Sequence, residues 1–242
     1  MSNKVVYPGK DLEAMDFAVR YHQWILKIFR PFLGKNLVEV GAGTGSVSEM
    51  FLRENIESLT LVEPSAEMFP LLKERVANWQ TDKKIRTYND IFTNVAAEIV
   101  SAQKPDTMIY VNVLEHIEDD ALELEAMHET LTDGGRILIF VPSLPRLYSN
   151  FDKHIGHFRR YTKRDLTDKT ERAGFKILRC GFFDFVGILP WWLKYRVLKS
   201  TTMQPGALKL YDQIVVPFAQ PIETLVPPPI GKNLILIAEK QS

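Results

Sequence analysis

The stretch "VEVGAGTGSVSEM" (residues 38–50) places three glycines between an apolar, strand-like segment and a segment with helical spacing. Glycine tolerates positive φ and lets the backbone approach a ligand closely, so such a turn is typical of ligand-binding α/β sheets. The spacing of Gly41, Gly43 and Gly45 is G-x-G-x-G, and Ser46 stands where a dinucleotide fingerprint has its third glycine. This departure argues against NAD or FAD. A tight connection without a ligand remains an alternative.

Outward from this turn, apolar segments alternate with amphipathic ones. This alternation predicts an α/β fold with a parallel sheet, and the near-continuous apolar strands indicate that helices cover both faces. Strands are expected at 36–40, 58–63, 84–89, 106–112, 136–142, 175–183 and 233–240, and helices at 11–30, 46–55, 65–79, 95–101, 119–131 and 162–172, the last one capped by Thr162 with Asp165.

Length and composition are those of one globular domain. We expect a lid helix within 1–34, a core at 35–185 and 233–242, and a cap at 187–232. Thirty basic and thirty acidic residues give a net charge of zero, which argues against a nucleic-acid partner. The single cysteine, Cys180, and the absence of an apolar signal segment or membrane span favour a cytoplasmic location.

Glu63 ends the second predicted strand, about 20 residues after the glycine turn. A carboxylate at this place in an α/β sheet can accept hydrogen bonds from both hydroxyls of a ribose. A glutamate that merely ends a strand in water is the alternative. The turn and the acid together therefore point to a nucleoside cofactor more strongly than either does alone.

Five segments follow one another along the chain: "VEVGAGTGSVS" (38–48), "LVEPSAEM" (61–68), "YNDIF" (88–92), "MIYVNVLEHIEDD" (108–120) and "LTDGGRILIFVP" (131–142). In this order they resemble the motifs of class I S-adenosylmethionine-dependent methyltransferases of the type 11/12 kind. The resemblance covers residues 35–185 and the last strand. It implies a Rossmann-like methyltransferase fold: a doubly wound, seven-stranded, mostly parallel sheet with its last strand antiparallel, plus a helical cap. It also implies S-adenosylmethionine as the cofactor and S-adenosylhomocysteine as the product.

The resemblance also assigns cofactor contacts. Glu63 would bind the ribose, Met68 would pack near the adenine, and Asp90 would accept from the adenine amino group. Glu39 would influence the ammonium of the methionine end, although a buried acid bonded to backbone is the alternative. The full set implied is Glu39, Gly41, Ala42, Gly43, Gly45, Glu63, Pro64, Met68, Asp90, Ile91, Asn112, Val113 and Leu114.

Methyl transfer from a sulfonium is an in-line displacement, so the protein mainly aligns the reactants and excludes water. A general base is needed only when the nucleophile arrives protonated. His116, just after the fourth strand, is the candidate base, although it could instead cap a helix or shape the pocket. The acids of 118–120 are more typical of a helix cap than of a metal site, so no metal is predicted.

The stretch "HIGHFRRYT" (154–162) leaves the fifth strand and enters a helix, which places it on the acceptor side of the pocket. Arginine binds carboxylates and phosphates bidentately, so this stretch can clamp an anionic acceptor; pairing of one arginine with Asp152 or Asp184 is the alternative. Metal binding by its two histidines is disfavoured because no known ligand spacing is present. The predicted acceptor-binding residues are Tyr21, His154, His157, Arg159, Arg160 and Tyr161.

The function expected is transfer of a methyl group to an oxygen or nitrogen of a small or carrier-linked acceptor. A nicotinamide-dependent reductase and a non-catalytic S-adenosylmethionine-binding protein are the alternatives. Trp191 and Trp192 beside Lys194 and Arg196 can rest on a membrane interface or meet a lipid-linked or glycan-linked acceptor. A plain hydrophobic cap or a dimer contact is the other interpretation, and the oligomeric state stays open.

Overall fold

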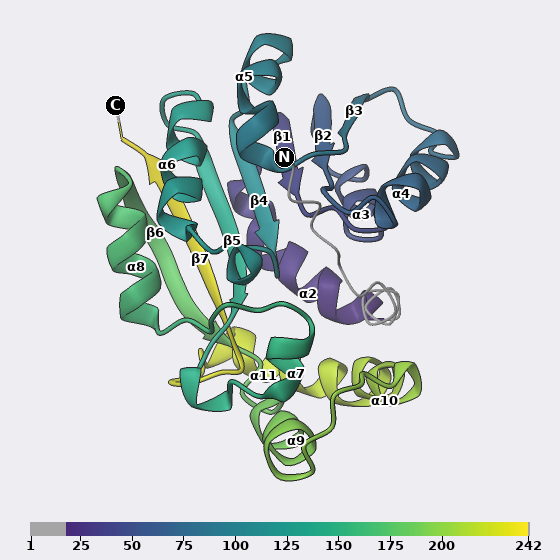
Figure 1. Ribbon diagram of the computed structural model, residues 1–242, viewed down its shortest axis with the longest axis vertical. Coiled ribbons are helices and arrows are strands. Elements are labelled where there is room, and N and C mark those ends of the chain that lie inside the picture. The colour runs from purple at the N-terminus through teal and green to yellow at the C-terminus, as the bar shows by residue number, and fades with distance from the viewer. Residues whose placement is uncertain (1–17, 242) are drawn as a thin grey trace.

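Seven strands form one sheet in the order β3-β2-β1-β4-β5-β7-β6, in a computed structural model that describes residues 18–241 (Figure 1). β1 to β5 run parallel, and β7 runs antiparallel to both β5 and β6. The predicted mostly parallel sheet with an antiparallel last strand is thus confirmed. The strands are β1 (Asn36–Val40), β2 (Ser58–Val62), β3 (Lys84–Tyr88), β4 (Thr107–Val111), β5 (Arg136–Pro142), β6 (Phe175–Phe183) and β7 (Asn233–Lys240).

Alternate residues of each strand enter two separate apolar layers, as the two-residue period of a strand requires. In β1, Leu37 joins the layer under one set of helices, whereas Val38 and Val40 join the layer under the other. The first set is α2 (Val19–Phe29), α3 (Ser48–Phe51), α4 (Met68–Ala77) and α11 (Val216–Leu225); the second is α5 (Phe92–Ala102), α6 (Asp120–Thr130) and α8 (Lys163–Arg172).

The remaining helices gather beyond the arrowhead of β4, at the end of the sheet where the parallel strands finish (Figure 1). Two of them widen into π-helical segments, which are often found near functional sites. They are α7 (Asn150–His154), α9 (Ile188–Trp191) with η4 (Trp192–Val197), and α10 (Pro205–Leu210) with η5 (Tyr211–Val215); the short turns are η1 (Arg30–Phe32), η2 (Leu114–His116) and η3 (Pro145–Leu147).

Element boundaries differ from the sequence predictions at the cofactor turn. The helix expected from residue 46 begins at Ser48, because the glycine turn continues through Val47. The helix expected from Ser65 begins at Met68. The Ser65 hydroxyl accepts a hydrogen bond from the Met68 amide at 3.2 Å. α7 was not predicted; Ser149 and Asp152 form its capping box. Residues 11–17 of the predicted N-terminal helix lie outside the described residues.

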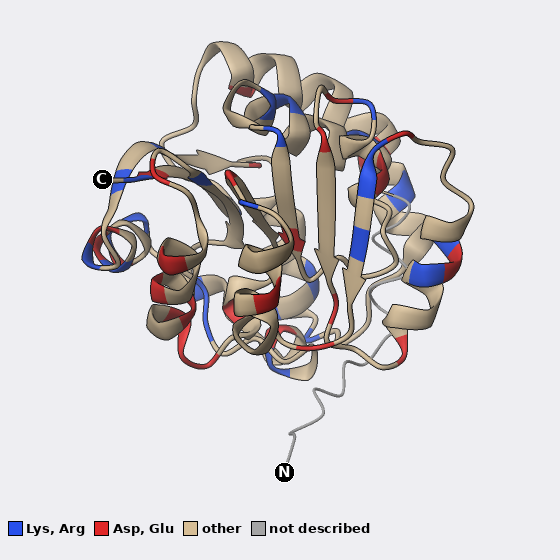
Figure 2. Ribbon diagram, turned by 90° about the horizontal axis from the view of Figure 1, so that it is seen from above, with Lys and Arg blue, Asp and Glu red and all other residues tan. Residues whose placement is uncertain are grey.

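Acidic and basic residues are interspersed along the helices and the sheet edges (Figure 2). Within residues 18–241, no helix combines the length and the hydropathy needed to cross a bilayer.

Candidate functional site

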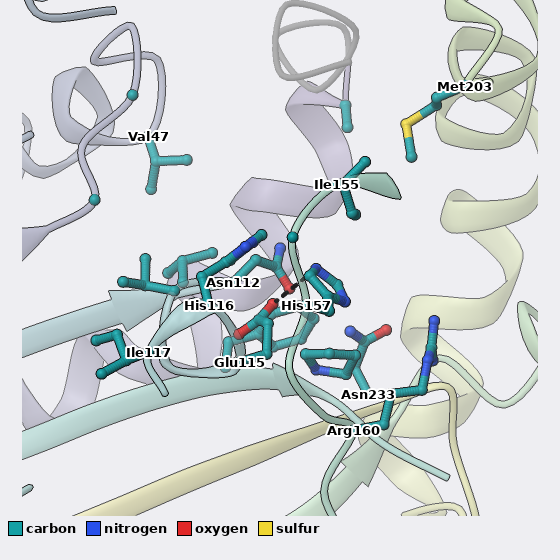
Figure 3. Close-up of a pocket in the computed structure, with 18 of the residues that line it drawn as sticks. Val47, Asn112, Glu115, His116, Ile117, Ile155, His157, Arg160, Met203 and Asn233 are labelled. Carbon is teal, nitrogen blue, oxygen red and sulfur yellow. Dashed lines mark ion pairs between the residues drawn. The ribbon is translucent and has the colours of Figure 1, made fainter. Parts of the chain in front are cut away.

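A cavity of about 870 Å³ opens at the carboxyl ends of the parallel strands. It lies at the neighbouring strands β1 and β4. From β1 the chain continues to β2 and β3 on one side of the sheet, and from β4 it continues to β5 on the other side. In doubly wound sheets, ligands bind in the crevice at this switch point. The volume is in the range of cofactor and ligand pockets. Side chains from the loop after β4, the loop after α7 and the cap converge on it (Figure 3).

The glycine turn forms one wall of the cavity. Gly41, Gly43 and Gly45 have φ of 70°, 57° and 84°, a region that other residues rarely adopt. A Cβ on Gly41 would lie 2.4 Å from a methyl of Val113, whereas a Cβ on Gly43 would meet no atom within 4 Å. Gly41 is therefore required by packing, and Gly43 leaves open space on the side of the turn that a ligand can use.

Glu63 braces this turn from the end of β2. One carboxylate oxygen accepts the Gly43 amide at 2.7 Å, and the other accepts the Ser65 amide at 2.7 Å. The side chain is 4 % exposed, and burial raises its pKa although both amides act in the opposite direction. Glu63 thus has a role in the protein itself, besides the ribose contact that the sequence predicts.

Glu39 lies buried just before the turn, 3 % exposed, and its Oε2 has no hydrogen-bond partner among the described residues. Burial, together with the negative charge of Glu63, raises the pKa of Glu39 from 4.5 to about 8. A buried carboxyl with an unsatisfied oxygen is costly unless a donor or cation approaches it.

The structure brings most of the predicted site residues together. Of the cofactor set, Gly41, Ala42, Gly43, Glu63, Pro64, Ile91, Asn112 and Val113 line the cavity, and Tyr21, His116, His154, His157 and Arg160 line it as well. The others lie behind its wall or outside it: Glu39, Gly45, Met68, Asp90, Leu114, Arg159 and Tyr161.

The residues outside the lining have other partners. Leu114 is fully buried in the apolar layer of α5, α6 and α8. Asp90 accepts from the Ile91 amide and the Asn94 side chain, each at 2.8 Å, at the exposed start of α5. Met68 is 4 % exposed at the start of α4. The adenine contacts of Met68 and Asp90, and the cofactor contact of Leu114, stay predictions.

The two arginines of "HIGHFRRYT" are both engaged in ion pairs. Arg160 lies 2.7 Å from Asp152, with the two side chains 1 % and 0 % exposed, and stacks on Trp191 at 4.7 Å from the ring centre. Arg159 is not among the residues that line the cavity, and it pairs with Asp120 at 2.7 Å. These contacts give both arginines a role in bracing the loop. An anion clamp for the acceptor stays a prediction, because Arg160 also lines the cavity.

Tyr161 also lies away from the cavity, as a fully buried core residue whose hydroxyl donates to Asp120 at 2.7 Å. Its backbone forms an isolated parallel bridge with Ser143, which holds the ring in the apolar layer beneath α6 and α8. The same stretch therefore supplies His154, His157 and Arg160 to the cavity and Tyr161 to the core.

A further buried acid, Asp184, was predicted only as a possible partner of an arginine, not as part of the cavity wall. Its carboxylate lies 2.8 Å from Lys232 and accepts from the hydroxyls of Tyr21, at 3.0 Å, and Tyr211. These contacts tie α2, the end of β6 and the cap together at the cavity wall. The sequence signal for it is the single acid that interrupts the apolar run 180–193.

Comparisons with known proteins agree with this geometry. The methyltransferase domain family matches residues 14–179, and among curated proteins no significant match is found. A SAM-dependent methyltransferase from Archaeoglobus fulgidus is 17 % identical, with a TM-score of 0.60 over 95 % of this chain and 98 % of that one.

Two further solved structures share the fold. The N-methyltransferase NodS from Bradyrhizobium japonicum WM9, solved with S-adenosylhomocysteine, is 12 % identical with a TM-score of 0.60, covering 96 % of this chain and 93 % of that one. The cyclase SpnF is 17 % identical with a TM-score of 0.58, covering 92 % and 81 %. A cyclase on the same fold shows that architecture alone does not fix the reaction. The chain belongs to the methyltransferase domain family, and its fold is that of the class I S-adenosylmethionine-dependent methyltransferases.

Proposed function

We propose that this protein transfers the methyl group of S-adenosylmethionine to an oxygen or nitrogen of a small or carrier-linked acceptor. The observation that carries the proposal is the pairing of a positive-φ glycine turn with Glu63 on the wall of an 870 Å³ cavity. The turn and Glu63 suit the nucleoside, and cap residues, among them Trp191, Tyr195 and Leu208, line a further part of the cavity, where the acceptor would bind.

Binding of S-adenosylhomocysteine, measured by calorimetry beside NADH, tests the cofactor. We expect saturable binding of S-adenosylhomocysteine and none of NADH, because the turn lacks the third glycine of a dinucleotide site. Label transfer from methyl-labelled S-adenosylmethionine to a panel of phenols, alcohols, amines and carboxylates then tests turnover. Binding of NADH alone would favour the reductase, and tight cofactor binding without transfer to any acceptor would favour the non-catalytic alternative.

His116 lines the cavity, just after the end of β4. Burial, and next the neighbouring His157, lower the pKa of His116 well below its usual 6.5, so the ring is neutral at pH 7. A neutral imidazole can accept the proton of a hydroxyl or ammonium acceptor, but the lowered pKa makes His116 a weaker base than a free imidazole. An acceptor that arrives deprotonated needs only alignment, for which the cavity walls suffice.

Replacement Glu39→Gln is expected to stabilise the cofactor-free protein at high pH and to weaken cofactor binding. The raised pKa means that the folded state holds the Glu39 proton more tightly than the unfolded chain does. Stability is therefore lost as pH rises from about 4.5 to 8. Glutamine does not titrate, so this loss of folding stability disappears. The effect is on the order of a few kcal/mol, because each unit of pKa shift corresponds to about 1.4 kcal/mol. The same change removes the carboxylate that is predicted to interact with the ammonium group of the cofactor. We therefore expect the affinity for S-adenosylhomocysteine to fall by about tenfold or more.

Urea unfolding at pH 5 and 8.5 and calorimetry with S-adenosylhomocysteine measure the two effects. Glu49→Gln is the matched control, because Glu49 is an exposed acid in the first turn of α3, close in sequence to the glycine turn. Unchanged cofactor affinity in Glu39→Gln would remove Glu39 from the cofactor site.

We infer further that the cap meets an anionic membrane surface, which would present a lipid-linked acceptor. Large apolar side chains of the cap are exposed, among them Trp192 at 46 %, Leu198 at 70 % and Phe218 at 71 %. All charged side chains exposed within 187–232 are basic: Arg196, Lys199 and Lys209. Aromatic and aliphatic side chains beside basic ones suit an interface with anionic headgroups.

Sedimentation with lipid vesicles tests this contact. We expect more protein to bind phosphatidylglycerol-containing vesicles than pure phosphatidylcholine vesicles, and added salt to reduce the difference. The double replacement Trp192→Ser and Leu198→Ser is expected to lower binding at least tenfold, since each buried side chain contributes about 1.5–3 kcal/mol. Leu122→Ser, on α6 and 55 % exposed, is the control. Equal sedimentation of both variants would contradict a membrane contact through the cap.

A further inference from the structure

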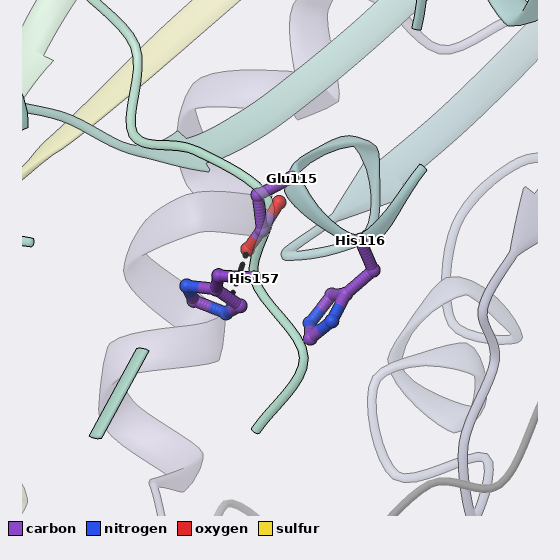
Figure 4. A group of neighbouring side chains, drawn as sticks. All are labelled: Glu115, His116 and His157. Carbon is purple, nitrogen blue, oxygen red and sulfur yellow. Dashed lines mark ion pairs between the residues drawn. The ribbon is translucent and has the colours of Figure 1, made fainter. Parts of the chain in front are cut away.

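Three side chains of the cavity wall gather into one cluster: Glu115, His116 and His157 (Figure 4). The first two belong to η2, after β4, and the third follows α7. Each offers one ligand atom, and these atoms all lie within 4.8 Å of one another. The two imidazole rings stand edge to face, with centroids 4.5 Å apart and an interplanar angle of 82°. The fold thus brings two nitrogens and a carboxylate to one point from separate segments.

Asp152 fixes the orientation of His157. Its Oδ1 lies 3.2 Å from the His157 Nδ1, and the same carboxylate accepts from Arg160 and Ser149, each at 2.7 Å. A carboxylate held by these donors is ionised and only accepts, so Nδ1 carries the ring proton and donates. The Nε2 of the neutral ring is then an acceptor, and it faces the Glu115 Oε1 at 3.7 Å.

Glu115 is a buried acid without a hydrogen-bond donor among residues 18–241. It is 0 % exposed, and neither carboxylate oxygen has a hydrogen-bond partner among the described residues. Arg160, a nearby cation, donates to Asp152 and to the Ser143 carbonyl instead. A buried carboxylate facing an imidazole lone pair is unfavourable. Two things relieve this cost: protonation of Glu115, whose pKa burial raises to about 8, or a cation lying between the two groups.

We propose that Glu115, His116 and His157 bind a divalent transition-metal ion on the acceptor side of the cavity. Two nitrogens and one carboxylate are the donors of His₂Glu zinc sites and of related iron sites with open positions. Donors about 2.1 Å from one ion lie at most about 4.2 Å apart, so the 3.7 Å pair already spans an ion. A contraction on the order of half an ångström brings in His116. Asp152 is the outer carboxylate that such histidine ligands commonly have.

The ion would define the acceptor class, an inference that rests on the proposed function. Three protein ligands leave a coordination position facing the cavity, and a bound metal ion lowers the pKa of an oxygen that it coordinates. The acceptors favoured are hydroxyl or phenol compounds whose oxygen can bind the ion and lose its proton there. In the metal-bound protein this replaces proton removal by His116.

Titration of tag-free, chelator-treated protein with Zn²⁺ by calorimetry and with Co²⁺ by visible absorption tests the site. We expect one ion per chain and Co²⁺ absorption bands typical of nitrogen and oxygen ligands. Glu115→Gln keeps the side-chain volume and removes an unsatisfied buried acid, so it should fold; we expect it to bind at least 100-fold more weakly. His154→Ala is the control, because His154 lines the same cavity outside the cluster. Affinity equal in wild type and Glu115→Gln would overturn the proposal, and so would binding well below one ion per chain.

Titration with S-adenosylhomocysteine separates the two proposals. The metal site is supported if the Glu115→Gln variant loses Zn²⁺ binding but keeps its affinity for S-adenosylhomocysteine. Wild type that binds S-adenosylhomocysteine but no Zn²⁺ overturns the metal site and leaves the methyltransferase function standing. Wild type that binds Zn²⁺ but no S-adenosylhomocysteine overturns the function alone.

Discussion

Glu63→Ala is expected to weaken S-adenosylhomocysteine binding by about 100-fold or more. The carboxylate accepts the amides of Gly43 and Ser65, each at 2.7 Å, and holds the glycine turn in its binding shape. The same group is the predicted partner of the ribose hydroxyls. Hydrogen bonds to a charged group contribute about 1.5–3 kcal/mol each, and losing even two of them accounts for this factor. Calorimetry at pH 7.5, with circular dichroism to verify folding, measures the change.

Glu67→Ala is the matched control for this experiment. Glu67 is an exposed glutamate four residues further along, at the start of α4, and its removal should leave affinity unchanged. Glu63→Gln keeps one acceptor oxygen and should fall between wild type and Glu63→Ala. An affinity for Glu63→Ala within about threefold of wild type would contradict a cofactor role for Glu63 and with it the assignment of the glycine turn.

The mostly parallel sheet and the position of the cavity could be predicted because they depend on local sequence patterns, whereas the strand order was not predicted because pairing between distant segments sets it. The spacing of the glycines at 41, 43 and 45 and the alternation of apolar with amphipathic segments are both visible in the sequence alone. Eight of the thirteen predicted cofactor residues line the cavity, because motifs that end parallel strands necessarily meet at one edge. The boundaries of α3 and α4 were less predictable, since turn geometry rather than periodicity sets them.

The partners of individual charged residues could not be predicted, because they are set by distant segments. The neighbouring Arg159 and Arg160 have different partners. Arg159 pairs with Asp120 at the start of α6, whereas Arg160 is buried and pairs with Asp152. Likewise, Asp184 meets Tyr21 across 163 positions of the sequence. Glu115 was not among the predicted site residues, yet it is fully buried and lines the cavity. Such residues come together into a site only when the chain folds, because their partners lie on distant segments.

Arg160→Met is expected to reduce the free energy of unfolding by about 3–5 kcal/mol. Methionine keeps most of the volume, but the Asp152 carboxylate, itself 0 % exposed, loses its guanidinium partner, and breaking one side of a buried ion pair costs about this amount. In the wild type, the pKa of Asp152 lies at about 2 instead of 3.8: burial raises it, and hydrogen bonds from His157 and Ser149 together with Arg160 more than reverse this effect. The carboxylate therefore stabilises the fold above pH 3.8, and this contribution is lost as pH falls toward 2.

Urea unfolding of Arg160→Met between pH 3 and 8, in metal-free buffer, measures both the loss and its pH window. The acid-induced loss should begin at a higher pH than in wild type, because the Asp152 pKa rises when the guanidinium is removed. Arg164→Met is the matched control: Arg164 is 90 % exposed and pairs with Asp168 at 3.5 Å, so its removal should cost less than about 0.5 kcal/mol. A loss below about 1 kcal/mol for Arg160→Met would mean that the Asp152 pair does little for the fold. Because Arg160 also lines the cavity, such a result would restore it as an anion clamp for the acceptor.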